Sequence, residues 1–257
     1  MVDVELIGGL GNNMFQYALG RIIADAKGYN LNVTKINQLD QFFKNVKNIT
    51  DKKSLNEPVL QIGYDTKVGP QTYIEKEVVD FEGAIKVRGF FQRQEFYNAH
   101  RDQLLKWFKT SVKLKKVPGK NDLVLHVRLG DYMGLGWQLD TGIFIDILKR
   151  EEYDRYFIVT DDPDNPIIGN ILETVDGGEV ISVDKISDFE FLRRSKLLVL
   201  SHSSFSWWSS FLSDAKKVIV PYDGNKGLWK ATPVQNDIDL IKDSSKYFRY
   251  VYDSRPA

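Results

Sequence analysis

Residues 122–128, Asp-Leu-Val-Leu-His-Val-Arg, are the first of five short apolar segments that decide the fold class of this chain. Each segment is bounded by polar residues and predicts a buried strand; the other four lie at residues 155–160, 179–183, 197–201 and 217–220. Between these segments, apolar residues recur at helical spacing at residues 141–150, 188–196 and 204–213. This alternation predicts an α/β fold, with a parallel sheet covered by helices on both faces.

The segment before this region is rich in lysine. Residues 109–121 contain Pro118-Gly119 and no apolar periodicity, which predicts a linker. We therefore expect two domains, at residues 1–115 and at residues 116–257.

The N-terminal region opens with a strand, a glycine-rich loop and a helix. Residues 2–7 predict the strand, and apolar residues at helical spacing from Met14 to Ala26 predict a helix that Gly28 ends. Further on, residues 83–91 predict a strand and residues 94–108 a helix. Residues 30–80 are polar and show no clear order.

Composition excludes several classes of protein. The 257 residues carry 35 Lys plus Arg and 35 Asp plus Glu, without the basic excess that nucleic-acid binding needs. The absence of cysteine excludes disulfides, a thiolate nucleophile and a zinc–thiolate site. No signal peptide or apolar run of about 20 residues is visible, so we expect a cytoplasmic protein, with peripheral membrane contact left open.

Polar clusters follow four of the predicted strands, where ligands of parallel sheets bind. The first is Gly8-Gly9-Leu10-Gly11-Asn12-Asn13. Counted from Gly9, the third glycine of a dinucleotide fingerprint falls on Met14, which argues against a nicotinamide site. Backbone amides at this helix start could approach an anion, or the glycines could simply form a tight turn.

The second cluster contains His126 and Arg128, which are two residues apart and so share one face of a strand. Arg128 would lie at the end of the sheet, where a guanidinium suits a diphosphate. The alternative is a structural ion pair between Arg128 and Asp131.

The third cluster is Asp161-Asp162-Pro163-Asp164. Asp162 and Asp164 could hold Mn²⁺ or Mg²⁺, although an aspartate that caps the next helix is favoured.

The fourth cluster, residues 201–208, lies at the start of a predicted helix. Ser203 and Ser204 could help to bind an anion there, or they could only cap the helix. Because no Gly-x-Ser-x-Gly elbow is present, a serine hydrolase is a poor alternative.

Together these segments resemble the family 11 glycosyltransferases, the α-1,2-fucosyltransferases. The family's Gly-Gly-Leu-Gly-Asn-Gln-Met-Phe-Gln-Tyr-Ala corresponds to residues 8–18, with Asn13 in place of glutamine. Its His-x-Arg-Arg-Gly-Asp-Tyr corresponds to residues 126–132, and its Ser-Thr-Phe-Ser-Trp-Trp to residues 203–208. Residues 89–92 are similar to its Gly-Tyr-Phe-Gln segment. The matches keep the family order and extend from residue 8 to about residue 222.

The resemblance implies a GT-B fold, with two Rossmann-like domains and a cleft between them. It implies that residues 1–115 form the acceptor-side domain and that residues 116–257 form the domain that binds the nucleotide-sugar donor. It implies an enzyme that moves L-fucose from GDP-β-L-fucose to a glycan acceptor with inversion, in an α-1,2 linkage to galactose. Neither a metal nor another cofactor is implied.

By the same resemblance, Arg128 would hold the β-phosphate, His126 would lie near the nucleotide and Asp188 would accept the guanine edge. That edge presents two parallel N–H donors, which a carboxylate can accept. The other expected donor-binding residues are Gly9, Gly11, Asn12, Asp162, Ser203, Ser204, Phe205 and Ser206. Arg128 and Asp131 are the catalytic candidates, and Trp137 is a candidate to stack on the acceptor sugar or to pack within its loop.

One departure from the family matters most. Leu129 stands where the family has a second arginine, which leaves open a different nucleotide sugar. Two further alternatives are a metal-dependent transferase at Asp162 and Asp164, and a non-catalytic nucleotide- or carbohydrate-binding module.

Overall fold

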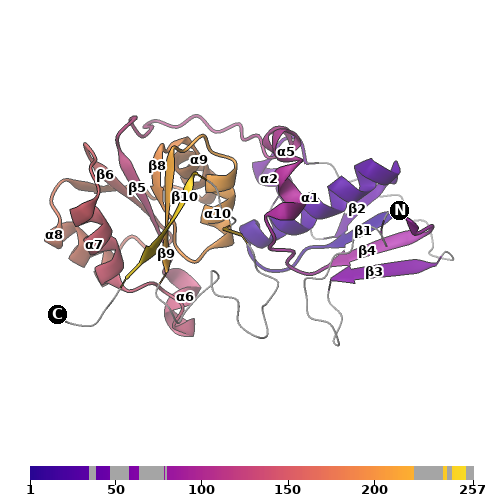
Figure 1. The fold of residues 1–257 in the computed structure, drawn as a ribbon, viewed down its shortest axis with the longest axis horizontal. Coiled ribbons are helices and arrows are strands. Elements are labelled where there is room, and N and C mark those ends of the chain that lie inside the picture. Colours follow the sequence, from indigo (N-terminus) through magenta and orange to yellow (C-terminus); the bar gives the residue numbers. More distant parts are fainter. Residues whose placement is uncertain are drawn as a thin grey trace. The chain divides into compact units, whose positions relative to one another are not determined.

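A computed structural model describes residues 1–34, 39–46, 58–63, 78, 80–222, 240–241 and 245–252. These residues divide into two compact α/β units (Figure 1). The first unit holds the described residues up to Ser111, together with Leu240. The second holds the described residues from Val112 to Tyr222, together with Ile241 and residues 245–252. The chain thus passes from one unit to the other inside the lysine-rich segment, where the sequence predicts a boundary after residue 115.

The first unit is built on a parallel four-stranded sheet in the order β2-β1-β4-β3. Its described elements are β1 (Val2–Glu5), α1 (Leu10–Lys27), β2 (Leu31–Thr34), α2 (Leu39–Phe42), β3 (Val59–Gly63), β4 (Ala84–Arg88), α4 (Glu95–Asn98) and α5 (Arg101–Trp107).

Two buried amides fix the connection between β1 and α1. Asn13 Nδ2 donates to the Ile7 carbonyl at 3.0 Å. Gln16 Oε1 accepts from the Ile7 N–H at 2.9 Å, and Gln16 Nε2 donates to the Ile7 carbonyl at 3.1 Å. Because both backbone groups of Ile7 are satisfied by the first turns of α1, the loop between them has a defined path at the carboxyl end of β1.

The second unit is built on a parallel six-stranded sheet in the order β10-β9-β8-β5-β6-β7. When the strands are numbered from β5 in chain order and the sheet is read from β7 to β10, the order is 3-2-1-4-5-6. This is the order of doubly wound nucleotide-binding folds. Its described elements are β5 (Leu123–Val127), α6 (Gly130–Leu135), α7 (Thr141–Arg150), β6 (Tyr156–Thr160), α8 (Pro166–Thr174), β7 (Gly178–Val180), α9 (Lys185–Arg194), β8 (Leu197–Val199), α10 (Ser204–Phe211), β9 (Lys217–Tyr222) and β10 (Tyr247–Val251).

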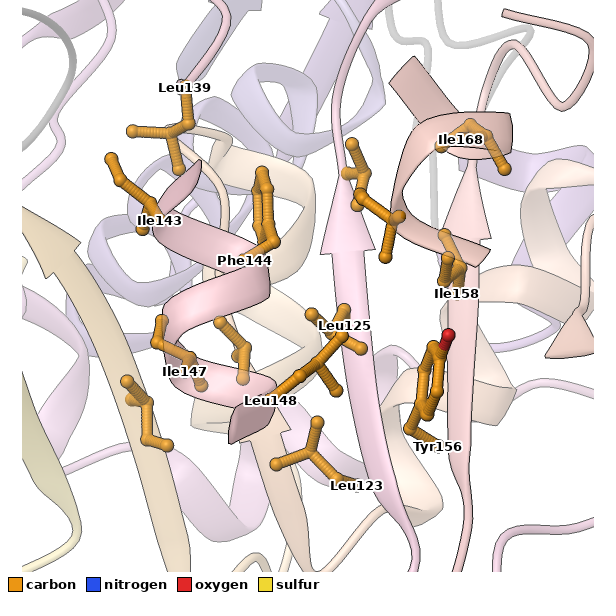
Figure 2. Close-up of a cluster of buried hydrophobic side chains, with 14 of the residues drawn as sticks. Leu123, Leu125, Leu139, Ile143, Phe144, Ile147, Leu148, Tyr156, Ile158 and Ile168 are labelled. Atoms are coloured by element: carbon orange, nitrogen blue, oxygen red, sulfur yellow. The ribbon is translucent and has the colours of Figure 1, made fainter. Parts of the chain in front are cut away.

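Helices cover both faces of this sheet, with α7 and α8 on one face and α9 and α10 on the other (Figure 1). Successive side chains of each strand point to opposite faces of the sheet. Figure 2 shows the first face, where α7 side chains such as Phe144 and Ile147 pack against Leu125 of β5 and its neighbours. The second face is aromatic, with Phe191 of α9 packed edge-on against Phe157 of β6.

The five strands predicted from residue 122 onward are all present, although β7 and β8 are shorter than predicted. The helix predicted at residues 94–108 is wrong as one element, because His100, at φ −108° and ψ 8°, leaves the helical conformation and separates α4 from α5. The helix predicted at residues 188–196 begins earlier, because Asp184 caps it by accepting the N–H groups of Ile186 and Ser187.

Several elements carry too weak a pattern to be predicted. The short strands β2 and β3 lie in the polar region of residues 30–80. Helices α6 and α8 and strand β10 were also not expected, and no residue of α6 is buried, so α6 has no apolar face to detect.

Candidate functional site

The clusters at residues 126–132 and 201–208 meet at one edge of the six-stranded sheet. They follow β5 and β8, which are hydrogen-bonded neighbours. The chain leaves β5 toward β6 on one side and leaves β8 toward β9 on the other. Strand order reverses at this point, and in doubly wound sheets nucleotide ligands bind outside the carboxyl ends of the two strands that flank such a reversal.

Arg128 lies directly after β5 and is held by two carboxylates. Its Nη1 atom is 2.7 Å from Asp161 Oδ2, and its Nη2 atom pairs with Asp131 Oδ1. The Arg128 guanidinium also lies 5.3 Å from the ring centroid of Tyr132. The side chain of Arg128 is 31% exposed, so it is positioned by protein groups but still open to a ligand.

Asp161 was not selected as a site residue from the sequence, yet it holds the Arg128 loop together. It follows β6, the other neighbour of β5, and its Oδ1 atom accepts the Leu129 N–H at 2.9 Å. A Cβ atom on Gly130 would lie 2.3 Å from Asp161 Oδ2, so the glycine of the His-x-Arg motif leaves room for this carboxylate. The signal in the sequence is the place of Asp161 directly after the apolar segment at residues 155–160.

Asp162, the predicted donor-binding residue, does not contact Arg128 in the described hydrogen bonds and ion pairs. Its carboxylate accepts from Asn165 Nδ2 at 2.9 Å, and its N–H donates to Thr160 Oγ1 at 3.2 Å. The residue that caps α8 is Asn165, which accepts the Ile167 N–H. The expectation that an aspartate caps this helix is therefore wrong.

His126 is buried within the second face of the sheet, on the side of α9 and α10. Its Nδ1 atom is hydrogen-bonded to the Ser201 hydroxyl, and its ring lies 5.7 Å from that of Phe205. Burial lowers the pKa of His126 to about 3, and the charge of Arg128 adds to the effect. The imidazole is therefore neutral near pH 7 and supports the loop after β8 rather than carrying charge.

The loop after β8 leads into α10 with serines in different roles. Ser203 caps α10 by accepting the Phe205 N–H at 3.3 Å, and Ser204 is the first helical residue. The buried Ser206 hydroxyl donates to the carbonyls of Ser201 and Ser203, at 3.3 and 3.0 Å. Ser206 thus shapes the loop, while Ser204 at the start of α10 is only half-buried.

Tyr132 connects the Arg128 loop to the loop after β8. Its hydroxyl donates to the His202 carbonyl at 2.8 Å. Burial raises the pKa of Tyr132 to about 12, so the hydroxyl keeps the proton that this bond uses. Trp137 packs edge-on against the Tyr132 ring, at 5.7 Å between centroids, and is 49% exposed. Its contact fits loop packing and leaves about half of the side chain open.

Asp188 lies in the first turn of α9, which packs on α10 through the rings of Phe189 and Phe205. Asp188 Oδ1 accepts the Val183 N–H at 3.1 Å. Burial raises the pKa of Asp188 to about 6, with a smaller contribution from Asp184. A half-buried carboxylate that costs free energy to ionise is typical of a binding position.

In the first unit, Gly9, Gly11 and Asn12 lie at the start of α1. Gly9 precedes the helix with extended backbone and no side-chain cap, and the first turn holds no acidic residue. Gly11 is buried, and Asn12 Oδ1 accepts from Gln92 Nε2 at 2.9 Å.

Within the described part of the chain, no three histidine or acidic side chains lie close enough to hold a metal ion.

Comparison with known proteins adds an independent observation. No family model matches this sequence. The chain is 22% identical to an α-1,2-colitosyltransferase of Escherichia coli, over 83% of this chain and 88% of that relative. The chain is therefore similar to a glycosyltransferase over most of the length of both proteins. The resemblance that its motifs indicate is thereby confirmed.

Solved structures confirm the fold of this chain. It superimposes on the fucosyltransferase NodZ from Bradyrhizobium with a TM-score of 0.55 and 14% identity, covering 88% of this chain and 95% of that chain. A NodZ α-1,6-fucosyltransferase structure soaked with GDP-fucose gives a TM-score of 0.52, 14% identity and coverage of 88% and 96%. The α/β, GT-B-like fold class is confirmed. Among the helices that the structure describes, none is long and apolar enough to cross a bilayer.

Proposed function

We propose that this protein transfers L-fucose from GDP-β-L-fucose to a glycan hydroxyl with inversion, forming an α-1,2 linkage to galactose. The observation that carries the proposal is the placement of Arg128 between Asp161 and Asp131 at the strand-order reversal, beside the loop that starts α10. An arginine there can donate two hydrogen bonds to a diphosphate while the helix start offers free N–H groups.

The relatives support a GDP-sugar donor, but they differ from one another in the linkage that they form. NodZ has been crystallised with GDP and soaked with GDP-fucose, and it is an α-1,6-fucosyltransferase. The Escherichia coli relative is an α-1,2-transferase. The α-1,2 linkage is proposed because the sequence relative and the family resemblance agree on it.

The proposed mechanism is attack of the acceptor oxygen on C1 of fucose as the bond from C1 to the β-phosphate oxygen breaks. The acceptor hydroxyl loses its proton to solvent. Negative charge grows on the departing GDP, and Arg128 and the N–H group of Ser204 would stabilise it. The Ser203 N–H is already bonded to the Ser201 carbonyl at 2.7 Å, so Ser203 would act by capping α10. Asp188 would accept the guanine edge, and His126 and Phe205 would support the loop from behind. Asp131 pairs with Arg128, so we assign it to orienting the guanidinium.

The loop of Gly9, Gly11 and Asn12 is proposed to contribute N–H groups to donor oxygens. Asp162 is proposed to act indirectly, through the turn that holds Asp161. Ser206 is also proposed to act indirectly, by holding the loop before α10, because its hydroxyl donates to the Ser201 and Ser203 carbonyls. Trp137 remains the candidate for stacking on an acceptor sugar.

A direct test combines binding with transfer. Thermal stability is measured with GDP, GDP-fucose, GDP-mannose, UDP and UDP-galactose, each with and without EDTA, and GDP release is followed with galactose-terminated acceptors. We expect stabilisation by GDP and GDP-fucose that survives EDTA, and a product whose linkage NMR assigns. Stabilisation by a UDP sugar, or only without EDTA, would overturn the donor. GDP binding with no turnover to any acceptor or to water would favour a non-catalytic module.

A second donor is favoured by one observation, the colitosyltransferase relative. Colitose is the 3-deoxy form of L-fucose, so both sugars present the same C1 chemistry to Arg128. The same GDP-release assay, with GDP-colitose and GDP-fucose in competition, distinguishes the two donors by their ratio of kcat/KM.

A further inference from the structure

A tight turn of three buried residues lies between β8 and α10. The Ser203 N–H donates to the Ser201 carbonyl at 2.7 Å, which closes the turn with His202 at its centre. The Ser201 hydroxyl is bonded to His126 Nδ1, and the Ser203 carbonyl accepts the Ser206 hydroxyl at 3.0 Å. These bonds give the turn a defined shape, and the turn sets the position at which α10 begins.

The centre of this turn is joined to the loop that carries Arg128. Tyr132, a half-buried residue of α6, donates its hydroxyl to the His202 carbonyl at 2.8 Å. The ring of Tyr132 lies beside the Arg128 guanidinium, at 5.3 Å from the ring centroid, and Trp137 packs edge-on against it. One side chain therefore contacts both the arginine and the turn that precedes α10.

The other interactions of the Arg128 side chain do not reach this turn. Arg128 pairs with Asp131 in its own loop and with Asp161 after β6. Among the hydrogen bonds and ion pairs of the described residues, neither carboxylate is bonded to the turn before α10. His126 does bond the turn, but it lies within β5, two residues before Arg128. The Tyr132 side chain is thus placed to relate the guanidinium to the first N–H groups of α10.

We propose that Tyr132 is a positioning residue that holds the Arg128 guanidinium and the start of α10 together, so that both reach the diphosphate of one nucleotide. The inference rests on the proposed function and names how two contacts of that function are kept in place. All of these groups belong to the second unit. Without the hydroxyl, the turn at His202 and the Arg128 loop can move independently, and a displacement of about 1 Å can cost about a hundredfold in rate.

The test uses Tyr132→Phe, which keeps the ring and removes only the bond to the His202 carbonyl. The matched control is Tyr153→Phe. Tyr153 is also half-buried, packs edge-on against Tyr156 and donates its hydroxyl to the Leu148 carbonyl at 2.9 Å. Because Tyr153 comes just before β6, it lies at the opposite edge of the sheet from the carboxyl strand ends.

Binding and turnover are measured for both variants. Calorimetry gives Kd for GDP and for GMP, which lacks the β-phosphate, and GDP release from GDP-fucose with galactose-terminated acceptors gives kcat. Thermal melting gives Tm, which both variants should lower because each loses one hydrogen bond.

We expect Tyr132→Phe to weaken GDP binding about five- to tenfold and to lower kcat about tenfold to a hundredfold. Its affinity for GMP should change less than about twofold, because the displaced groups meet the β-phosphate. Tyr153→Phe should leave both affinities and kcat unchanged.

A double variant tests whether the effect passes through Arg128. In the Arg128→Ala background, Tyr132→Phe should weaken GDP binding by a smaller factor than it does alone, because residues that serve one contact have coupled effects.

Three results would overturn the positioning role alone. The first is equal GDP affinity and kcat in Tyr132→Phe and Tyr153→Phe, which would leave the hydroxyl a structural role only. The second is an equal loss of affinity for GDP and GMP, which would mean that the whole site is disturbed. The third is an undiminished effect of Tyr132→Phe in the Arg128→Ala background, which would separate Tyr132 from the guanidinium.

Failure of the proposed function gives a different result. No GDP binding by the unaltered protein would remove that function and this inference together, before any variant is compared. GDP binding without transfer would remove the proposed activity, while the comparison of GDP and GMP affinities would still decide the role of Tyr132.

Discussion

The Nη1 atom of Arg128 lies 2.7 Å from Oδ2 of Asp161, across the neighbouring carboxyl ends of β5 and β6. Asp161 also accepts the Leu129 N–H, so one carboxylate fixes both the backbone after β5 and the guanidinium that follows it. In the absence of a ligand, the guanidinium of Arg128 is ion-paired with two carboxylates, those of Asp131 and Asp161. A bound diphosphate would compete with these carboxylates for the guanidinium. Asp131 is 63% exposed, so its ion pair with Arg128 is the one that a diphosphate would replace.

Replacing Arg128 tests the proposed contact with the departing phosphate. Loss of one pre-positioned donor to a developing anion costs about 3–4 kcal/mol, so Arg128→Ala should lower kcat at least a hundredfold. Arg150→Ala is the matched control, because Arg150 is 69% exposed and pairs with Asp146 on α7. Steady-state GDP release and thermal melting are measured for both. Near-normal turnover in Arg128→Ala would remove Arg128 from the mechanism.

Asp161 and Asp131 should differ in importance although both pair with Arg128. Asp161→Asn keeps an oxygen for the Leu129 N–H but loses the charge that holds the guanidinium, and a small displacement of Arg128 should cost about tenfold to a hundredfold in kcat. Asp131→Asn removes an exposed ion pair and should cost at most about fivefold. The comparison needs kcat, KM and Tm for both variants.

The same pair of variants tests Asp131 as a general base. Removal of a base lowers rates about 10²- to 10⁴-fold and removes its limb from the pH–rate profile. A profile of Asp131→Asn that matches the unaltered protein would confirm the orienting role. A large loss with an altered acidic limb would instead make Asp131 the base.

Asp188 should make GDP binding depend on pH. The guanine edge needs an ionised carboxylate, and burial raises the pKa of Asp188 to about 6 in the free protein. Bound guanine donors favour the ionised form, so affinity is full above pH 7 and falls as pH drops through 6, to about a tenth at pH 5. Calorimetry between pH 5 and 8 measures this dependence.

Asp188→Asn is the control for that dependence. It should weaken GDP binding at pH 8 and flatten the pH profile. Because the raised pKa means that the folded protein penalises the carboxylate above pH 6, the same variant should raise Tm at pH 8. The penalty disappears as pH falls below the unfolded value, so the two proteins should converge in Tm near pH 4. An unchanged pH profile in Asp188→Asn would assign the titration to another group.

Much of the site could be predicted because strand ends are visible in a sequence. The apolar segments around His126 and Leu198 are short and bounded by polar residues, so the sequence predicts that the clusters after them lie at strand ends. The structure confirms this for both clusters. The pairing of β5 with β6 and β8 follows from long-range order that no local pattern contains. For that reason Asp161 and Asp162 could not be distinguished as the partner of Arg128 until their strands were placed side by side.

Other details depend on packing that the sequence does not display. His126 was expected near the nucleotide, but its neutral, buried ring and its bond to Ser201 arise from the aromatic face made by α9 and α10. Ser206 looks like a ligand in a serine-rich motif, yet its hydroxyl is taken by carbonyls of its own loop. Hydroxyls near a helix start have local acceptors within reach, and local bonds compete with any ligand.

Leu129, which replaces the second arginine of the family motif, belongs to the core. It is 1% exposed and packs in the cluster of β5, α7 and α8 that includes Val127 and Ile143. Its side chain therefore takes the face of the sheet away from His126. An arginine here would place its charge among aliphatic side chains, where an uncompensated charge costs about 3–5 kcal/mol.

Restoring the family residue should consequently damage this protein instead of improving it. Leu129→Arg is expected to lose about 3 kcal/mol or more of unfolding free energy in urea, with no gain in GDP affinity. Leu129→Met, close in volume and apolar, should lose less than about 1.5 kcal/mol. If Leu129→Arg were instead as stable as Leu129→Met and bound GDP more tightly, its guanidinium would have reached the site, and Arg128 would not be the only cation that this loop can present to a phosphate.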